Sequence, residues 1–87
     1  MTIENQIRTF INENFLFGDE TVQYTNDDSF IRKGIVDSIA ILELVMFVQE
    51  AYHIKVQDQE ITPDNFDSIN SLAKYIQSKQ NLETPSE

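Results

Sequence analysis

The sequence of 87 residues contains no cysteine. Disulfides, thiolate metal sites and a cysteine nucleophile are therefore excluded, and cysteine usage does not indicate the redox compartment. The first residues also lack a basic region followed by an apolar one, and no apolar run approaches the roughly 20 residues that span a bilayer. We therefore expect a soluble, cytoplasmic protein that is not exported.

Basic residues are scarce as well, since six Lys and Arg residues stand against fifteen Asp and Glu residues. The formal net charge of −9 repels phosphate backbones and anionic lipids, so we expect neither nucleic-acid nor membrane partners. Solubility explains this acidity, and basic protein partners are the functional alternative. The length predicts one domain with a single small core, and we expect a monomer.

Repeats are absent, and strand-like alternation is too short anywhere to support a sheet. Apolar residues at helical spacing predict helices instead. The segments expected to be helical are residues 2–14, residues 39–52, a short turn at residues 62–66, and a last helix after the capping pair 67–68. The predicted fold class is all-α, a small helical bundle of three principal helices plus one short helix. Residues 1–80 would form the domain, and residues 81–87 are expected to be a disordered tail.

A long loop is expected between the first and second helices, because residues 17–36 show no period and collect turn-forming residues. About 20 residues without secondary structure are uncommon in a compact domain and favour a functional segment. Six apolar residues predict that this loop packs against the core: Phe17, Val22, Tyr24, Phe30, Ile31 and Ile35.

The second helix has apolar residues on two faces. Its core face is predicted to consist of Ile41, Leu44, Val45, Val48 and Tyr52. The other face carries Ile39, Leu42 and Met46, bordered by Ser38, Glu43, Gln49 and Glu50. A small domain rarely buries a central helix completely, so this face favours partner binding. Packing under the long loop or the short helix is the alternative.

Ser38 has two possible roles on its position alone. It can cap the second helix, as can Asp37 beside it. As a nucleophile it would need a general base, but the only histidine, His53, lies about 22 Å further along a continuous helix. The glycine and the spacing of a calcium loop do not accompany the acidic residues Asp58, Glu60, Asp64 and Asp67. We therefore expect neither an enzyme nor a metal site.

The residues around Ser38 resemble the acyl carrier and peptidyl carrier family, whose signature is an Asp-Ser pair and an aliphatic residue at a helix start. The residues that carry the resemblance are Gly34, Ile35, Val36, Asp37, Ser38 and Ile39, followed by Leu42, Glu43, Leu44, Val45 and Met46. It extends from about Ile3 to Ile76, because the expected helices follow the family's order. The resemblance implies that Ser38 carries 4'-phosphopantetheine, donated from coenzyme A by a phosphopantetheinyl transferase, and that Asp37 helps to position Ser38.

The resemblance further implies a non-catalytic carrier that holds its cargo as a thioester on the prosthetic arm. Its partners would be the transferase, an adenylating or acyl-loading enzyme, and downstream acyl-processing enzymes. They would dock on a surface formed by Ile39, Leu42, Glu43, Met46 and Glu50.

Several positions depart from the pattern of fatty-acid carriers. Ala40 and Gln49 replace common acids, Arg32 and Lys33 add positive charge, and Phe47 occupies a position that is usually small. These departures predict a discrete acyl or aminoacyl carrier of a specialised biosynthetic pathway, whose partners recognise apolar shape more than charge. A general fatty-acid carrier is the alternative within the same fold. A helical adaptor without a prosthetic group is the alternative from another class.

Overall fold

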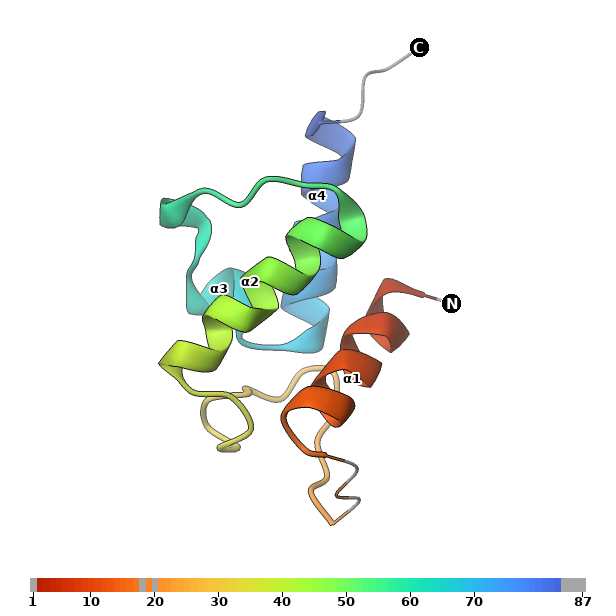
Figure 1. Cartoon of the computed structure of the whole chain (residues 1–87), viewed down its shortest axis with the longest axis vertical. Coiled ribbons are helices and arrows are strands. Elements are labelled where there is room, and N and C mark those ends of the chain that lie inside the picture. The colour runs from red at the N-terminus through yellow and green to blue at the C-terminus, as the bar shows by residue number, and fades with distance from the viewer. Residues whose placement is uncertain (1, 18, 20, 84–87) are drawn as a thin grey trace.

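The computed structural model describes residues 2–17, 19 and 21–83 (Figure 1). Its elements are α1 (Ile3–Asn14), α2 (Ser38–Tyr52), the short 3-10 helix η1 (Asp58–Glu60), α3 (Pro63–Phe66) and α4 (Ile69–Glu83). The described residues contain no strand. The prediction of an all-α bundle with three principal helices and one short helix is therefore confirmed, as is the long connection between α1 and α2.

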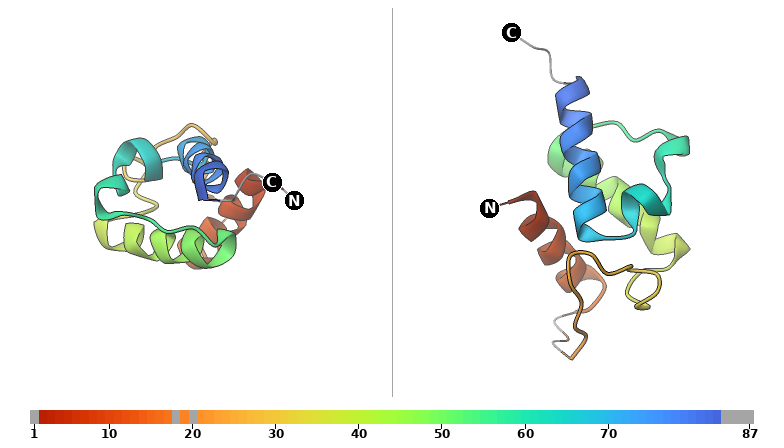
Figure 2. Two further views of the ribbon diagram at one scale, coloured as in Figure 1. Left: turned by 90° about the horizontal axis from the view of Figure 1, so that it is seen from above. Right: turned by 180° about the vertical axis from the view of Figure 1, so that it is seen from behind.

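The helix α4 contacts each of the other three α-helices. Seen from above, α2 lies along one side of the molecule, with α3 and α4 on the other (Figure 2). The core between them includes the fully buried side chains of Ile7, Ile11, Leu44, Val48, Leu72 and Ile76. Burial of each such side chain contributes about 1.5–3 kcal/mol to the free energy of folding, so these apolar faces determine how the helices pack.

Local sequence explains where α1 begins and how it meets α2. Thr2 is the N-cap of α1, because its hydroxyl accepts a hydrogen bond from the backbone N–H of Asn5 at 3.1 Å. Phe10 stacks on Phe47 of α2, with 4.2 Å between the ring centroids. The unusual aromatic residue at position 47 thus has a packing role, because it joins α1 to α2.

The α1–α2 loop packs against the core through most of its expected anchors. Phe30 and Ile35 are buried, and Val22 and Tyr24 pack against the core while remaining half-buried. Two expectations are wrong, since Phe17 is 83% exposed and Ile31 is 47% exposed. Phe17 has a left-handed backbone with φ of 51°, which directs the chain away from the helical path. Ile31 instead lies beside Ser38, as described below.

The chain after α2 is held to α4 through Glu60. Its carboxylate accepts hydrogen bonds from the backbone N–H of Gln57 at 2.9 Å and the Tyr75 hydroxyl at 3.0 Å, and it pairs with Lys79 at 3.2 Å. The Gln57 N–H above all, together with Tyr75 and Lys79, holds the pKa of Glu60 below its ordinary value of 4.5. The ionised carboxylate therefore connects η1 to α4.

The end of α4 differs from the expectation. The helix continues to Glu83, so residues 81–83 are helical and the expected disordered tail is wrong there. The run before Glu83 contains no helix breaker, and Pro85 is the first residue that opposes a helix. Residues 84–87 lie outside the described residues, and their disorder stays a prediction.

Candidate functional site

Asp37 and Ser38 stand at the start of α2 and have different structural roles. Asp37 is the N-cap, because its Oδ1 accepts a hydrogen bond from the backbone N–H of Ala40 at 2.8 Å. Ser38 is the first helical residue, and its side chain is exposed. Of the two possible caps, Asp37 therefore takes the role, and the Ser38 hydroxyl is left out of it.

The turn that leads into α2, which we call the Ile31 turn (residues 29–36), is closed by its own backbone. The carbonyl oxygen of Phe30 accepts hydrogen bonds from the N–H groups of Ile35 at 2.9 Å and Val36 at 3.3 Å. Gly34 reverses the chain with a φ of 72°, a left-handed conformation that residues with a side chain rarely adopt. The turn thus delivers Asp37 and Ser38 to the surface from a buried anchor at Phe30.

Asp67, in the junction between α3 and α4, holds the Ile31 turn through hydrogen bonds. Its Oδ1 accepts a hydrogen bond from the backbone N–H of Ile31 at 3.0 Å, and its Oδ2 accepts one from the Ser29 hydroxyl. Its carbonyl oxygen accepts a third from the Phe30 N–H at 2.9 Å. Sequence reasoning missed this role, because Asp67 and Ile31 are 36 residues apart and no local pattern connects them.

Asp67 was expected to share the capping of α4 with Ser68. The Ser68 Oγ accepts the hydrogen bond of the Ser71 N–H at 3.1 Å, whereas the Asp67 side chain is directed to the loop. Asn70, in the first turn of α4, also contacts the α1–α2 loop, because its backbone N–H donates to the Asn26 carbonyl oxygen at 2.9 Å. The start of α4 therefore fixes the position of the loop as well as packing against the core.

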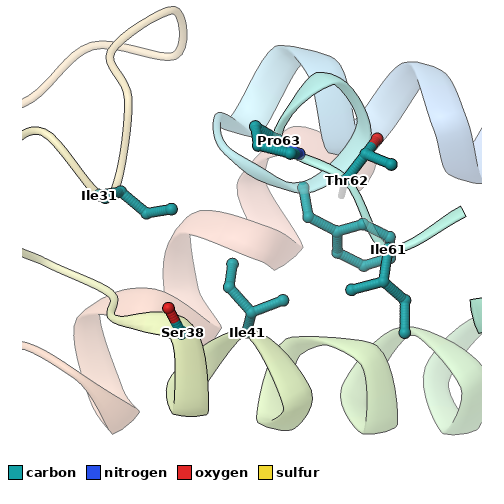
Figure 3. A pocket seen from close by; sticks show the side chains of 7 residues that line it. Ile31, Ser38, Ile41, Ile61, Thr62 and Pro63 are labelled. Carbon is teal, nitrogen blue, oxygen red and sulfur yellow. The ribbon is translucent and has the colours of Figure 1, made fainter. Parts of the chain in front are cut away.

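Two open apolar grooves meet at Ser38. One has a volume of about 220 Å³ and is lined by Ile31, Ser38, Ile41, Ile61, Thr62, Pro63 and Phe66. The other has a volume of about 380 Å³ and is lined by Phe15, Ile31, Gly34, Ile35, Val36, Asp37, Ser38 and Ala40. Figure 3 shows the first groove, with Ser38 at the start of α2, Ile31 on the loop facing it, and Pro63 at the start of α3. Ile31 and Ser38 belong to both grooves.

The second apolar face of α2 is exposed. The exposed stripe, as we call Ile39, Leu42 and Met46, has exposed fractions of 75%, 54% and 60%. Packing of this face under the long loop or the short helix is therefore wrong. The predicted core face is confirmed, since Ile41, Leu44, Val45 and Val48 are buried and Tyr52 is half-buried.

The polar residues that border the exposed stripe divide into two kinds. Glu43 and Glu50 are exposed to solvent. Gln49 is half-buried, and its Oε1 accepts a hydrogen bond from the backbone N–H of Val56 at 3.0 Å. Glutamine at this position therefore holds the chain that follows α2, a role the sequence did not suggest.

His53 and the acidic residues are the other candidate partners of Ser38. His53 caps the opposite end of α2 in a left-handed conformation with φ of 55°. In the described part of the chain, no cluster of three or more histidine, aspartate or glutamate side chains is placed to hold a metal ion. No helix within residues 2–83 that the structure describes is both long enough and apolar enough to cross a bilayer.

Comparison with known proteins identifies relatives over nearly the whole chain, although no protein-family model matches it. Over 81 residues, or 93% of this chain, it is 25% identical to a D-alanyl carrier protein of Streptococcus uberis and covers 99% of that protein. Over an equal span it is 26% identical to an acyl carrier protein of Chlamydia trachomatis and covers all of it. The resemblance to the acyl carrier family is thus confirmed by homologues named D-alanyl carrier protein and acyl carrier protein.

Proposed function

Because its homologues along nearly the whole chain are carrier proteins, we propose that this chain is a discrete acyl or aminoacyl carrier with 4'-phosphopantetheine attached to Ser38. The observation that carries the proposal is the exposed hydroxyl of Ser38 at the first residue of α2, where Asp37 alone performs the capping. A serine whose hydroxyl is not used to hold the helix is open to modification without loss of the fold.

The surroundings of Ser38 fit a long, flexible arm. Apolar side chains border the two grooves that meet there, Ile61 and Pro63 the first, Phe15 and Val36 the second, and Ile31 both. They offer contact to an arm without requiring a fixed hydrogen-bond pattern. When bound, the group supplies a terminal thiol that carries cargo as a thioester, a chemistry that a chain without cysteine lacks.

The chain itself contributes position rather than catalysis to its modification. Ser38 Oγ forms a bond to phosphorus, the phosphoanhydride bond of coenzyme A breaks, and the nucleotide leaves. The proton of the hydroxyl must pass to a base of the transferase, since His53 is at the other end of α2. Asp37 holds the first turn of α2, so that the Ser38 hydroxyl is presented in one backbone geometry.

The docking surface that we propose consists of the exposed stripe together with Glu43 and Glu50. The transferase, an adenylating or acyl-loading enzyme and downstream acyl-processing enzymes would bind there. Association would combine burial of three apolar side chains with pairing of two carboxylates to basic groups of the partner. Dependence on coenzyme A implies the cytoplasm, and we expect the carrier to be a monomer.

A specialised pathway is supported by the reduced negative charge near Ser38. Ala40, the third helical residue after the Asp37 cap, carries no charge, and Arg32 is an exposed cation on the Ile31 turn. Lys33 pairs with Asp28 at 3.8 Å, so part of its charge is compensated within the chain. The general fatty-acid carrier remains the second candidate, because a relative named acyl carrier protein is as similar as the D-alanyl carrier protein.

The attachment site is tested by mass spectrometry of the apo protein after incubation with coenzyme A and a broad-specificity transferase. We expect one added phosphopantetheine group in the wild type and in Ser78→Ala, which alters an exposed serine of α4. We expect none in Ser38→Ala. An unmodified wild type contradicts the proposal and favours the helical adaptor, whereas addition that persists in Ser38→Ala contradicts the assignment of Ser38 as the attachment site.

The two pathway candidates are separated by loading the modified protein. Efficient malonyl loading and chain elongation by fatty-acid synthesis enzymes would favour the general carrier. Loading by an adenylating enzyme, with refusal of malonyl transfer, would favour the specialised one.

A further inference from the structure

Ile31 occupies an unusual position for an aliphatic residue. It is 47% exposed, yet it borders both grooves that meet at Ser38. An enzyme that brings a group to Ser38 Oγ approaches the surface where both grooves meet, and Ile31 is the apolar side chain that they share. We therefore expect the enzyme to contact Ile31, separately from its contact with the exposed stripe on α2.

Ile31 is held in place by hydrogen bonds of its backbone rather than by burial of its side chain. Its N–H donates to Asp67 Oδ1 at 3.0 Å, and its carbonyl oxygen accepts from the Gly34 N–H at 3.1 Å. The Ser29 hydroxyl donates to Asp67 and itself accepts from the Arg32 N–H at 3.1 Å. These bonds restrict the backbone of the turn, although residues 31–34 are exposed.

The Asp67 carboxylate contacts the Ile31 turn, whereas a different carboxylate positions Ser38. The hydroxyl-bearing residue is positioned by the Asp37 cap, whose hydrogen bond to the Ala40 N–H lies within α2. The carboxylate of Asp67 reaches the Ile31 turn from the junction of α3 and α4. The Asp37 carboxylate thus orders the helix start at Ser38, and the Asp67 carboxylate orders Ile31 on the turn beside it.

We infer that Asp67 is a positioning residue for modification of Ser38, because it pre-orders Ile31 as a contact for the modifying enzyme. The inference rests on the proposed function. A turn whose backbone is already ordered loses less conformational entropy when a partner binds it, so disorder of the turn would weaken binding of the carrier rather than slow the chemical step. Removal of the Asp67 carboxylate should raise the KM of the transferase for the carrier and leave kcat unchanged.

The kinetic test uses the full-length apo chain as the varied substrate of a transferase with coenzyme A. We expect Asp67→Ala to raise KM by about 2- to 10-fold, the range for ordering one side chain on binding, with kcat retained. Asp67→Asn keeps an acceptor for the Ile31 N–H and should restore most of the wild-type KM. Asp64→Asn is the matched control, because it removes a nearby exposed carboxylate that lines a separate surface pocket together with Asp67.

A double-mutant cycle shows whether Asp67 acts through Ile31. Ile31→Ala alters an exposed side chain and should raise KM by a similar factor without loss of folding. In the Ile31→Ala background, Asp67→Ala should have no further effect on KM, because the contact that it orders is already gone. Full multiplication of the two effects would overturn the inference.

A measurement without any enzyme gives the second readout. The backbone NMR order parameter of Ile31 should fall from about 0.85 to below about 0.6 in Asp67→Ala, while that of Ser38 is unchanged. An unchanged order parameter at Ile31, or an unchanged KM for a folded Asp67→Ala, would also overturn the inference. Failure of the wild type to be modified at all would instead count against the proposed function.

Discussion

Two adjacent residues at the start of α2 divide a structural role and a proposed chemical role between them. Asp37 accepts the hydrogen bond of the Ala40 N–H, and Ser38 presents an exposed hydroxyl. A side-chain acceptor at an N-cap satisfies a backbone donor that the helix cannot satisfy itself. The stability of the helix start thus depends on Asp37 and not on Ser38, the residue proposed to be modified.

This division of roles predicts that alanine substitution destabilises the protein at Asp37 and has little effect on its stability at Ser38. Asp37→Ala should lower the free energy of unfolding by about 1 kcal/mol, because the Ala40 N–H loses its partner. Asp37→Asn should cost less, since its amide oxygen still accepts. Ser38→Ala should change the free energy of unfolding by no more than about 0.5 kcal/mol. Urea titration measures all three, and equal losses for Asp37→Ala and Ser38→Ala would show that Ser38 helps to cap the helix.

At the scale of the element, α2 is a helix with one face in the core and another in solvent. Leu44 and Val48 are fully buried, whereas Ile39 and Met46 are 75% and 60% exposed. Exposed apolar side chains on one stripe of a small domain mark a binding surface more often than a defect. Met46 suits such a surface because its flexible thioether adapts to partners of different shape.

Charged substitutions on the exposed stripe should leave the fold intact and weaken partner binding. Ile39→Asp and Met46→Asp should change the free energy of unfolding by no more than about 0.5 kcal/mol, because both side chains are exposed. Each should lower the rate of modification of Ser38 at limiting carrier concentration. Thermal unfolding and transferase kinetics on the same samples measure the two effects.

Leu44→Ala is the contrasting variant on the buried face. It should cost about 2–5 kcal/mol, since it leaves a cavity in the core. If Ile39→Asp and Met46→Asp destabilised the fold as Leu44→Ala does, the exposed stripe would belong to the core and the docking surface would be wrong.

The whole molecule combines a small core with a large excess of one charge. Six basic residues cannot neutralise fifteen acidic ones, even where Lys33 pairs with Asp28 and Lys79 with Glu60. Domains of this size have a free energy of unfolding of about 4–13 kcal/mol, so self-repulsion is a sizeable part of the balance.

Screening of this charge predicts a rise in Tm with added magnesium chloride or sodium chloride. A gain of about 1 kcal/mol corresponds to about 4–8 °C for a domain of this length. The double variant Glu13→Gln/Asp64→Asn, which neutralises two exposed carboxylates, should begin at a higher Tm and respond less to salt. Differential scanning calorimetry measures both, and a flat or falling response of the wild type would mean that its carboxylates are already compensated locally.

The sequence by itself determined the helices and the candidate site. Apolar residues at helical spacing identified α1, α2 and the start of α4, because a helix must bury one face and its period is visible in the residue order. The Asp37-Ser38 pair and the residues after it carried the resemblance, because that signature is contiguous along the chain. Both signals are local, and local signals survive in a single sequence.

Only the tertiary structure decided what surrounds Ser38. It made Asp37 the cap, placed Ile31 on the surface between two grooves, and bound the Ile31 turn to Asp67. Phe17 and Ile31 look alike as apolar loop residues in the sequence, and both proved to be exposed. The physical reason is that a hydrogen bond between residues 36 positions apart depends on how the helices pack, and residue order contains no period or motif that records it.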